Sequence, residues 1–267
     1  MAALRLVCLF VVLVIGLVHS LDIPKIKDVP LLVKTLKNLN RGPPHQVMTK
    51  RANVQEKWIT QKLDNFDASN TQTYKMRYLL NDDFQTEGSP IFIYLGGEWE
   101  IEESMISAGH WYDMAQEHKG VLVYTEHRYY GSKCDLPWIF QTCSEFGWFQ
   151  SSGSRSQPFG STFPATLYED TCEGVFGSKY DSAGIHANIR ATNDDFGGLN
   201  VNATNIYFVQ GALDGWSKVG AGVAQGATII PYASHCPDTG SISASDSAEL
   251  VASKKKLIKL VAQWLED

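Results

Sequence analysis

The chain has 267 residues, of which 44% are hydrophobic and 19% are charged, and its formal net charge is −6. This composition is typical of a globular protein with one sizeable core. The acidic balance does not favour a nucleic-acid partner.

Residues 1–20 have the features of a secretory signal peptide. Arg5 makes the start basic, residues 6–18 form an apolar run of thirteen, and the segment ends at the small residue Ser20. Thirteen apolar residues are fewer than a membrane-spanning helix needs, which favours a signal peptide. The alternative is an uncleaved membrane anchor. The sequence therefore predicts a secreted or lysosomal, luminal protein that has no membrane segment after signal cleavage.

Residues 21–57 differ from the rest of the chain in charge. They hold eight Lys or Arg against three acids, whereas residues 58–267 hold 14 against 26. Two proline-containing breaks and the dibasic pair Lys50-Arg51 lie within this stretch. A removable pro-segment and a permanent basic leader both fit the pattern.

The next part, residues 58–133, is expected to be packed α/β structure. Residues 73–79 alternate as in a half-buried strand, and residues 91–95 and 121–124 are continuous apolar runs typical of buried strands. A helical spacing over 105–118 separates these two runs. Strand, helix and strand in this order indicate a crossover unit in a sheet that is buried on both faces.

Residues 141–198 are rich in Ser, Gly and aromatic residues, and we expect loops and short helices there, lying over a core. Residues 199–267 contain two more predicted strands, 205–210 and 227–232, followed by a C-terminal amphipathic helix. The helix is preceded by Asp246-Ser-Ala-Glu249, which resembles a capping box.

Four cysteines remain after signal cleavage: Cys134, Cys143, Cys172 and Cys236. In an oxidising compartment they can pair in three ways. No Cys-x-x-Cys pair exists and the histidines lack metal-ligand spacing, so the sequence predicts neither a metal site nor a cofactor. Asn202-Ala203-Thr204 is a sequon, which predicts glycosylation at Asn202 unless the sequon is unused.

Two residues near the C-terminus follow the order of a hydrolytic triad. Asp214 comes after one predicted strand, His235 comes after the next, and a helix follows, as in α/β-hydrolases. In such a site the acid orients the imidazole, which takes the proton of a serine. The alternatives are a simple turn at Asp214-Gly215 and a structural His235.

Several segments resemble, in order, the secreted serine exopeptidases of the prolyl carboxypeptidase, dipeptidyl peptidase II and thymus-specific serine protease family. They are "WITQKLDNFDASNTQTYKMRYLLND", "GSPIFIYLGGEWEIEE", "GVLVYTEHRYYGSK", "QTCSEFGWFQSS", "GALDGW" and "ASHCPD". The resemblance covers about residues 56–265. It implies peptide-bond hydrolysis near a proline or from a peptide terminus, with Asp214 as the acid and His235 as the base.

The resemblance also assigns roles to other residues. It implies a disulfide between Cys143 and Cys172 and an unpaired Cys236 beside the base. The loop Gly96, Gly97, Glu98 and Trp99 follows the strand predicted at 91–95. In α/β-hydrolases the loop at this position helps to form the oxyanion hole, so we expect the same role here. The alternative is a solvated acidic loop.

One departure from the family is severe, because no Gly-x-Ser-x-Gly elbow exists anywhere in the chain. The family places this elbow soon after His-Arg-Tyr-Tyr-Gly, whereas here a central segment is missing between about Lys133 and Asp135. Ser217 follows the acid and Ser132 lacks a strand-turn-helix around it, so neither is expected to replace the nucleophile. Gln210 in place of Asn and Gly215 in place of Pro are milder departures.

The sequence thus predicts an α/β-hydrolase-like core with a central deletion that removes the elbow strand and most of the helical lid. Residues 58–133 and 199–267 would form the two parts of the core, and residues 134–198 a remnant of the lid. Three hypotheses stay open: an inactive incomplete or spliced form of an active peptidase, a secreted non-catalytic homologue that binds peptides or a protein partner, and a hydrolase with an unconventional nucleophile.

Overall fold

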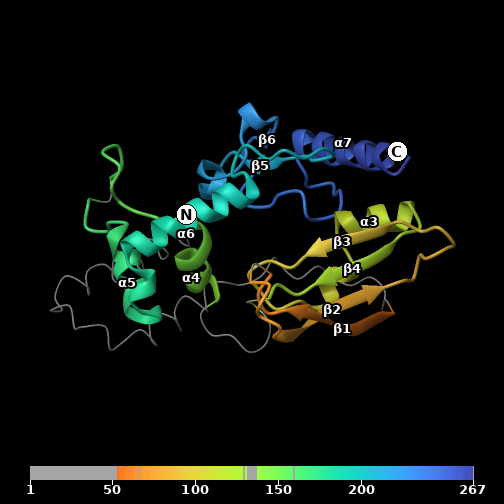
Figure 1. The fold of residues 1–267 in the computed structure, drawn as a ribbon. Coiled ribbons are helices and arrows are strands. Elements are labelled where there is room, and N and C mark those ends of the chain that lie inside the picture. The colour runs from red at the N-terminus through yellow and green to blue at the C-terminus, as the bar shows by residue number, and fades with distance from the viewer. Residues whose placement is uncertain (1–52, 66, 129, 131–136, 159, 267) are drawn as a thin grey trace. The chain divides into compact units, whose positions relative to one another are not determined.

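The computed structural model describes residues 53–266 except 66, 129, 131–136 and 159, and Figure 1 shows their fold. The expected signal peptide, nearly all of the leader, Ser132 and Cys134 lie outside the described residues. The described part is mixed α/β.

Four strands form one sheet in the order β1-β2-β4-β3. β1 pairs antiparallel with β2, β2 pairs antiparallel with β4, and β3 pairs parallel with β4. The strands are β1 (Val54–Lys62), β2 (Thr73–Asn81), β3 (Ile91–Leu95) and β4 (Val121–Thr125). β1 was not expected, and it crosses the boundary placed at residue 57.

The parallel pair β3 and β4 is joined by a helical crossover, as the sequence predicted. The expected helix over 105–118 is divided into a 3₁₀ turn, η1 (Glu103–Ile106), and the helix α3 (His110–Glu117). The division falls at Gly109, whose φ of 101° lies in a region that favours glycine. A continuous helix through this position would require a negative φ.

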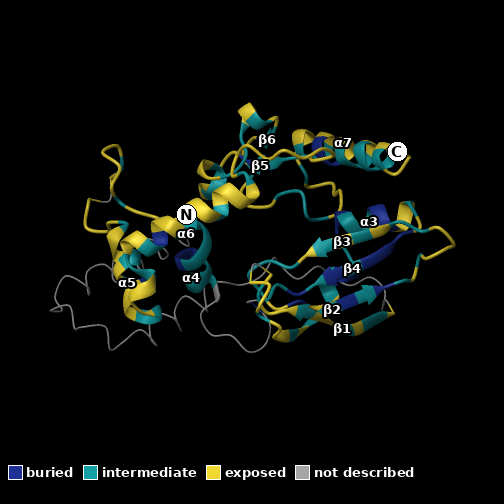
Figure 2. Cartoon of the chain, viewed as in Figure 1, coloured by how far each residue is buried: buried dark blue, intermediate teal, exposed yellow. Residues whose placement is uncertain are grey.

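The core of this sheet lies on one face only. Six buried side chains, contributed by the sheet, η1, α3 and the loop before η1, pack together there: Leu79, Ile101, Ile106, Ala115, Leu122 and Tyr124. On the opposite face the β3 side chains Ile91, Ile93 and Leu95 are 65%, 60% and 74% exposed. The expectation of a sheet buried on both faces is therefore wrong, and Figure 2 shows the contrast between buried β4 and exposed positions of β3.

Residues 137–196 are mostly helical. The segment contains α4 (Pro137–Gln141), the π-helical turn η2 (Thr142–Phe146), α5 (Thr166–Phe176), the 3₁₀ turn η3 (Ser178–Tyr180) and α6 (Ser182–Phe196). α6 has 15 residues and is longer than the short helices expected. It begins at Asp181, whose side chain accepts a hydrogen bond from Gly184 N at 2.8 Å and so caps the helix.

The C-terminal part contains a parallel two-stranded sheet of β5 (Val209–Gly211) and β6 (Thr228–Ile230). Both strands are shorter than expected, since Asn205 and Tyr232 have φ angles of 58° and 59° that end extended backbone. Two 3₁₀ turns, η4 (Gly215–Lys218) and η5 (Val223–Gln225), lie between the strands.

The C-terminal helix is α7 (Ala248–Trp264). Its N-cap is Ser247, whose Oγ accepts from Leu250 N at 3.2 Å, so the capping box expected to start at Asp246 is wrong by one residue. Asp246 instead binds Lys254 Nζ at 2.8 Å. Within the described part of the chain, no helix has the length and apolarity needed to cross a bilayer.

Candidate active site

Asp214 lies in the loop that leaves β5 and caps the following turn, η4. Its Oδ1 accepts a hydrogen bond from Trp216 N at 2.9 Å, and the residue is only 8% exposed. Its Oδ2 lies 2.7 Å from His235 Nδ1. One carboxylate therefore organises its own turn and orients the imidazole.

The loops after β5 and β6 are bound to each other through their backbones. Ala212 N donates to Ile230 O at 3.0 Å, and Leu213 N donates to Ala233 O at 2.9 Å. Gly211 permits this approach, because a Cβ at that position would lie 2.0 Å from Ser234 O. These bonds set Asp214 and His235 side by side although 21 positions separate them in the chain.

Among the described residues, His235 has a carboxylate partner but no serine partner. Its side chain is 61% exposed, and in the described part of the chain its ring is hydrogen-bonded to Asp214 alone. In a serine hydrolase the acid holds Nδ1 while Nε2 receives the proton of the nucleophile. Ser217 lies within η4, where its N–H donates to Asp214 O at 3.1 Å.

Cys236, next to His235, is a free cysteine. Partial burial raises the pKa of its thiol, and the negative charges of Asp238 and Asp214 add to the shift. The thiolate is the nucleophilic form, so this environment works against Cys236 as a replacement nucleophile.

The loop after β3, expected to form an oxyanion hole, packs against the end of β4. Gly96 N donates to Thr125 O at 2.9 Å, so this amide is already paired. Trp99 Nε1 donates to Tyr124 Oη at 2.7 Å. Any backbone oxyanion donor from this loop would therefore have to come from Gly97, Glu98 or Trp99, since the Trp99 bond to Tyr124 uses the indole and not the backbone N–H. The negative charge of Glu98 also contributes to the raised pKa of Cys236, after burial and the charges of Asp238 and Asp214.

Four aromatic rings form a cluster at the acid loop that sequence reasoning missed. The ring centroid of Trp216 lies 5.7 Å from that of Trp138 and 6.3 Å from that of Trp148. Phe146 lies 5.5 Å from Trp138 and 4.2 Å from Trp148. The signal was the aromatic content of "PWIF", "SEFGWF" and "DGW", but residues far apart in sequence meet here only through the fold.

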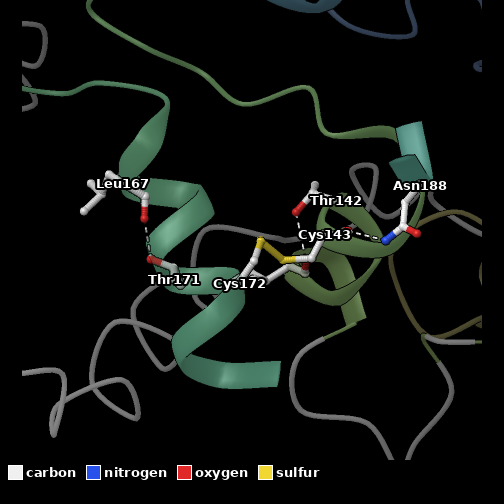
Figure 3. The surroundings of a disulfide bond; sticks show 7 residues. Thr142, Cys143, Leu167, Thr171, Cys172 and Asn188 are labelled. Carbon is white, nitrogen blue, oxygen red and sulfur yellow. Dashed lines mark hydrogen bonds between the residues drawn. A yellow bond between two sulfur atoms is a disulfide. The ribbon is translucent and has the colours of Figure 1, made fainter. Parts of the chain in front are cut away.

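A disulfide joins Cys143 of η2 to Cys172 of α5, with a Cα–Cα distance of 5.7 Å (Figure 3). The resemblance implied this pairing. Both cysteines are buried, and Asn188 Nδ2 of α6 donates to Cys143 O at 3.2 Å. The bond therefore lies in the small core that Ile185 and neighbouring side chains build between these helices.

Two further predictions concern glycosylation and metal binding. Asn202 is exposed in a loop, where a glycan would find room. No group of three or more His, Cys, Asp or Glu side chains suited to a metal ion occurs among the described residues.

A mixed α/β chain in which an acid and a histidine follow two neighbouring strands has the arrangement of serine-dependent hydrolases. The sequence model of the serine carboxypeptidase S28 family matches residues 61–136 and 132–257, so the chain belongs to this family of serine peptidases.

The curated proteins to which the chain is similar include some named as serine proteases and some named as carboxypeptidases. The thymus-specific serine protease of Mus musculus is 34% identical over 138 residues, which are 50% of this chain and 26% of that protein. The putative serine protease K12H4.7 of Caenorhabditis elegans is 29% identical, over 56% of this chain and 31% of that protein. The lysosomal Pro-X carboxypeptidase of Bos taurus is 41% identical over 76 residues, 28% of this chain and 15% of that protein.

The chain thus spans about a quarter to a third of the length of the first of these relatives. Among solved structures, a thermostable esterase from Pseudomonas putida covers 88% of this chain and 89% of its own, at 13% identity and a TM-score of 0.33.

Proposed function

We propose that this chain is an inactive form of a secreted or lysosomal serine exopeptidase, with the acid and base retained and the nucleophile missing. One observation carries the proposal. Asp214 Oδ2 lies 2.7 Å from His235 Nδ1, as between the acid and base of a triad, while the chain contains no Gly-x-Ser-x-Gly. Without a serine the imidazole has no proton to accept, and only weak residual catalysis is expected.

The proposed fold is an α/β-hydrolase-like core that lacks its elbow strand and most of its lid. The family match supports this, since it falls into two pieces that meet at residues 132–136. The exposed β3 also supports it, because a strand placed beside β3 would cover Ile91, Ile93 and Leu95. Sheet edges of this kind are normally covered or blocked in native proteins.

The substrate class of the parent activity follows from the relatives, two of which are named lysosomal Pro-X carboxypeptidases. We expect the complete form to cleave peptides next to proline or near a terminus. The same names support passage through the secretory pathway, in line with the expected signal peptide over residues 1–20.

A fluorophosphonate probe tests the missing nucleophile. The purified secreted chain is expected to stay unlabelled and to leave proline-containing peptides intact, while the bovine lysosomal Pro-X carboxypeptidase serves as the labelled control. Labelling mapped by mass spectrometry to Ser132 or Ser217, and abolished in a His235→Ala variant, would contradict the proposal.

A second candidate is a non-catalytic homologue that binds peptides or a protein partner. The observation that favours it is the core formed by the four-stranded sheet and α3, which is that of a folded protein and not of a fragment without packing. Heat-induced unfolding separates the two: a cooperative transition supports the binding protein, and a broad non-cooperative one removes it.

A further inference from the structure

Among the described residues, the outer edge of β3 has no neighbouring strand, and it carries backbone groups without a strand partner together with exposed apolar side chains. Val121 N donates to Pro90 O at 2.9 Å and Gly96 N donates to Thr125 O at 2.9 Å. In a parallel ladder the backbone groups of alternate residues face the same neighbour, so Phe92 and Tyr94 face β4 as Pro90 and Gly96 do. The N–H and C=O groups of Ile91, Ile93 and Leu95 therefore point to the outer edge.

These same three residues project apolar side chains from the uncovered face of the sheet, where they are 60–74% exposed. The other face at this edge is covered by α3, since Tyr94 packs on Trp111 with ring centroids 5.3 Å apart. An added strand would thus meet an aliphatic row on one face. On the other face it would meet the α3 side of the sheet, whose helix carries the acids Asp113 and Glu117.

Charge decides which occupant suits this edge. Residues 53–128, which contain the whole sheet, hold six Lys or Arg against thirteen Asp or Glu, a formal net charge of −7. Four of the acids, Glu98, Glu100, Glu102 and Glu103, follow β3 directly. A second copy of the chain would bring two such regions together and repel, whereas a cationic segment would be attracted.

We propose that the β3 edge binds an extended basic peptide by strand addition, with aliphatic side chains at every second position and Lys or Arg between them. The aliphatic side chains cover Ile91, Ile93 and Leu95, and the backbone groups pair with those of the same residues. This site uses neither Asp214 nor His235, but it rests on the proposed loss of the elbow strand, which would otherwise lie beside β3.

The test uses the full secreted chain and an eight-residue peptide of alternating valine and lysine with blocked ends. Binding is expected to slow amide hydrogen exchange at Ile91, Ile93 and Leu95 by about tenfold or more. The amides of Phe92 and Tyr94 already bond to β4 and are the internal control. A peptide methylated at every backbone nitrogen keeps its charge and side chains, but its backbone cannot donate hydrogen bonds. It is expected to bind at least about tenfold more weakly.

Ile93→Lys places a positive charge in the middle of the edge and is expected to weaken binding about tenfold or more. Val223→Lys, at a 77% exposed position outside the sheet, is the matched control and should bind as the unaltered chain does. Slow exchange at Leu122 and Tyr124 checks that each variant is folded.

Three results would overturn the proposal. The first is equal binding of the N-methylated peptide or of a valine–glutamate peptide, which would remove strand addition or the charge requirement. The second is protection that leaves residues 91–95 unchanged. The third is concentration-dependent self-association that Ile93→Lys abolishes, which would assign the edge to a second copy of the chain.

Discussion

The two sheets of this chain reach their form in different ways. The four-stranded sheet has long strands, and its core side chains such as Leu122 and Tyr124 are fully buried. The two-stranded sheet that carries Asp214 and His235 has three residues in each strand. Its loops are bound by backbone and side-chain hydrogen bonds, and of its strand residues only Gly211 and Ile230 are buried. The candidate site is thus a network of local polar contacts, whereas the first sheet depends on packing.

Leu122→Ala should have the largest effect if packing stabilises the first sheet. Leu122 is 0% exposed, so its truncation is expected to lower the free energy of unfolding by about 3 kcal/mol or more. Leu95→Ala, at a 74% exposed position of the neighbouring strand, is the control and should cost under about 0.5 kcal/mol. Urea unfolding measures both, and equal losses would show that the packing contrast is wrong.

Cys172→Ser tests the helical region between the two sheets. The Cys143–Cys172 bond closes a loop with a sequence separation of 29, and its loss is expected to cost about 3 kcal/mol. Cys236→Ser, at the cysteine that forms no disulfide, should leave stability nearly unchanged. Thermal unfolding under non-reducing conditions compares the two variants, and an unchanged melting temperature for Cys172→Ser would contradict the prediction.

Asp214→Ala tests whether the site is held by its polar contacts. The change removes the hydrogen bond that caps η4 and the partner of His235, with an expected cost of about 1 kcal/mol. Asp214→Asn retains a good capping side chain and should cost less. If both variants unfold at the same urea concentration as the parent chain, the carboxylate does not organise this loop.

The smallest expected effect is a pH dependence from His110 of α3. Burial lowers the pKa of His110 in the folded chain below its usual value of about 6.5. At a pH between the lowered pKa and the usual one, His110 binds a proton in the unfolded chain but not in the folded chain. Stability should therefore fall as the pH drops below about 6.5.

His110→Asn is expected to make the loss of stability from pH 7.5 to 5 smaller, while Gln116→Asn, which changes an uncharged and exposed residue of the same helix, should leave it as in the parent chain. Urea unfolding at each pH gives the slope. A steeper slope in His110→Asn would show that the sign is wrong.

Strands that are continuous apolar runs were predicted more accurately than the elements whose residues are largely polar. β3 was predicted with its observed bounds because Ile91–Leu95 is a continuous apolar run. β1 was missed because its residues are largely polar and exposed, and it is a strand through its pairing with β2. α6 contains Ser182 and Gly184, which weaken a helical pattern, and its Asp181 cap was not recognised.

The candidate site was predicted as a pair, Asp214 and His235, from the order of strands and loops. Its aromatic surroundings were not, because Trp138 and Trp216 are brought together by contacts between distant segments. The paired state of the Gly96 amide also depends on β4, which the local sequence of that loop does not contain.

The central claim is that an elbow segment is missing after the strand that ends at Thr125. Reading the gene and its transcripts across codons 125–145 tests it most directly. We predict that the gene encodes, within this interval, a skipped coding segment with Gly-x-Ser-x-Gly. An uninterrupted coding sequence in both gene and transcript, with no such segment, would contradict the account and leave a chain that never had its serine.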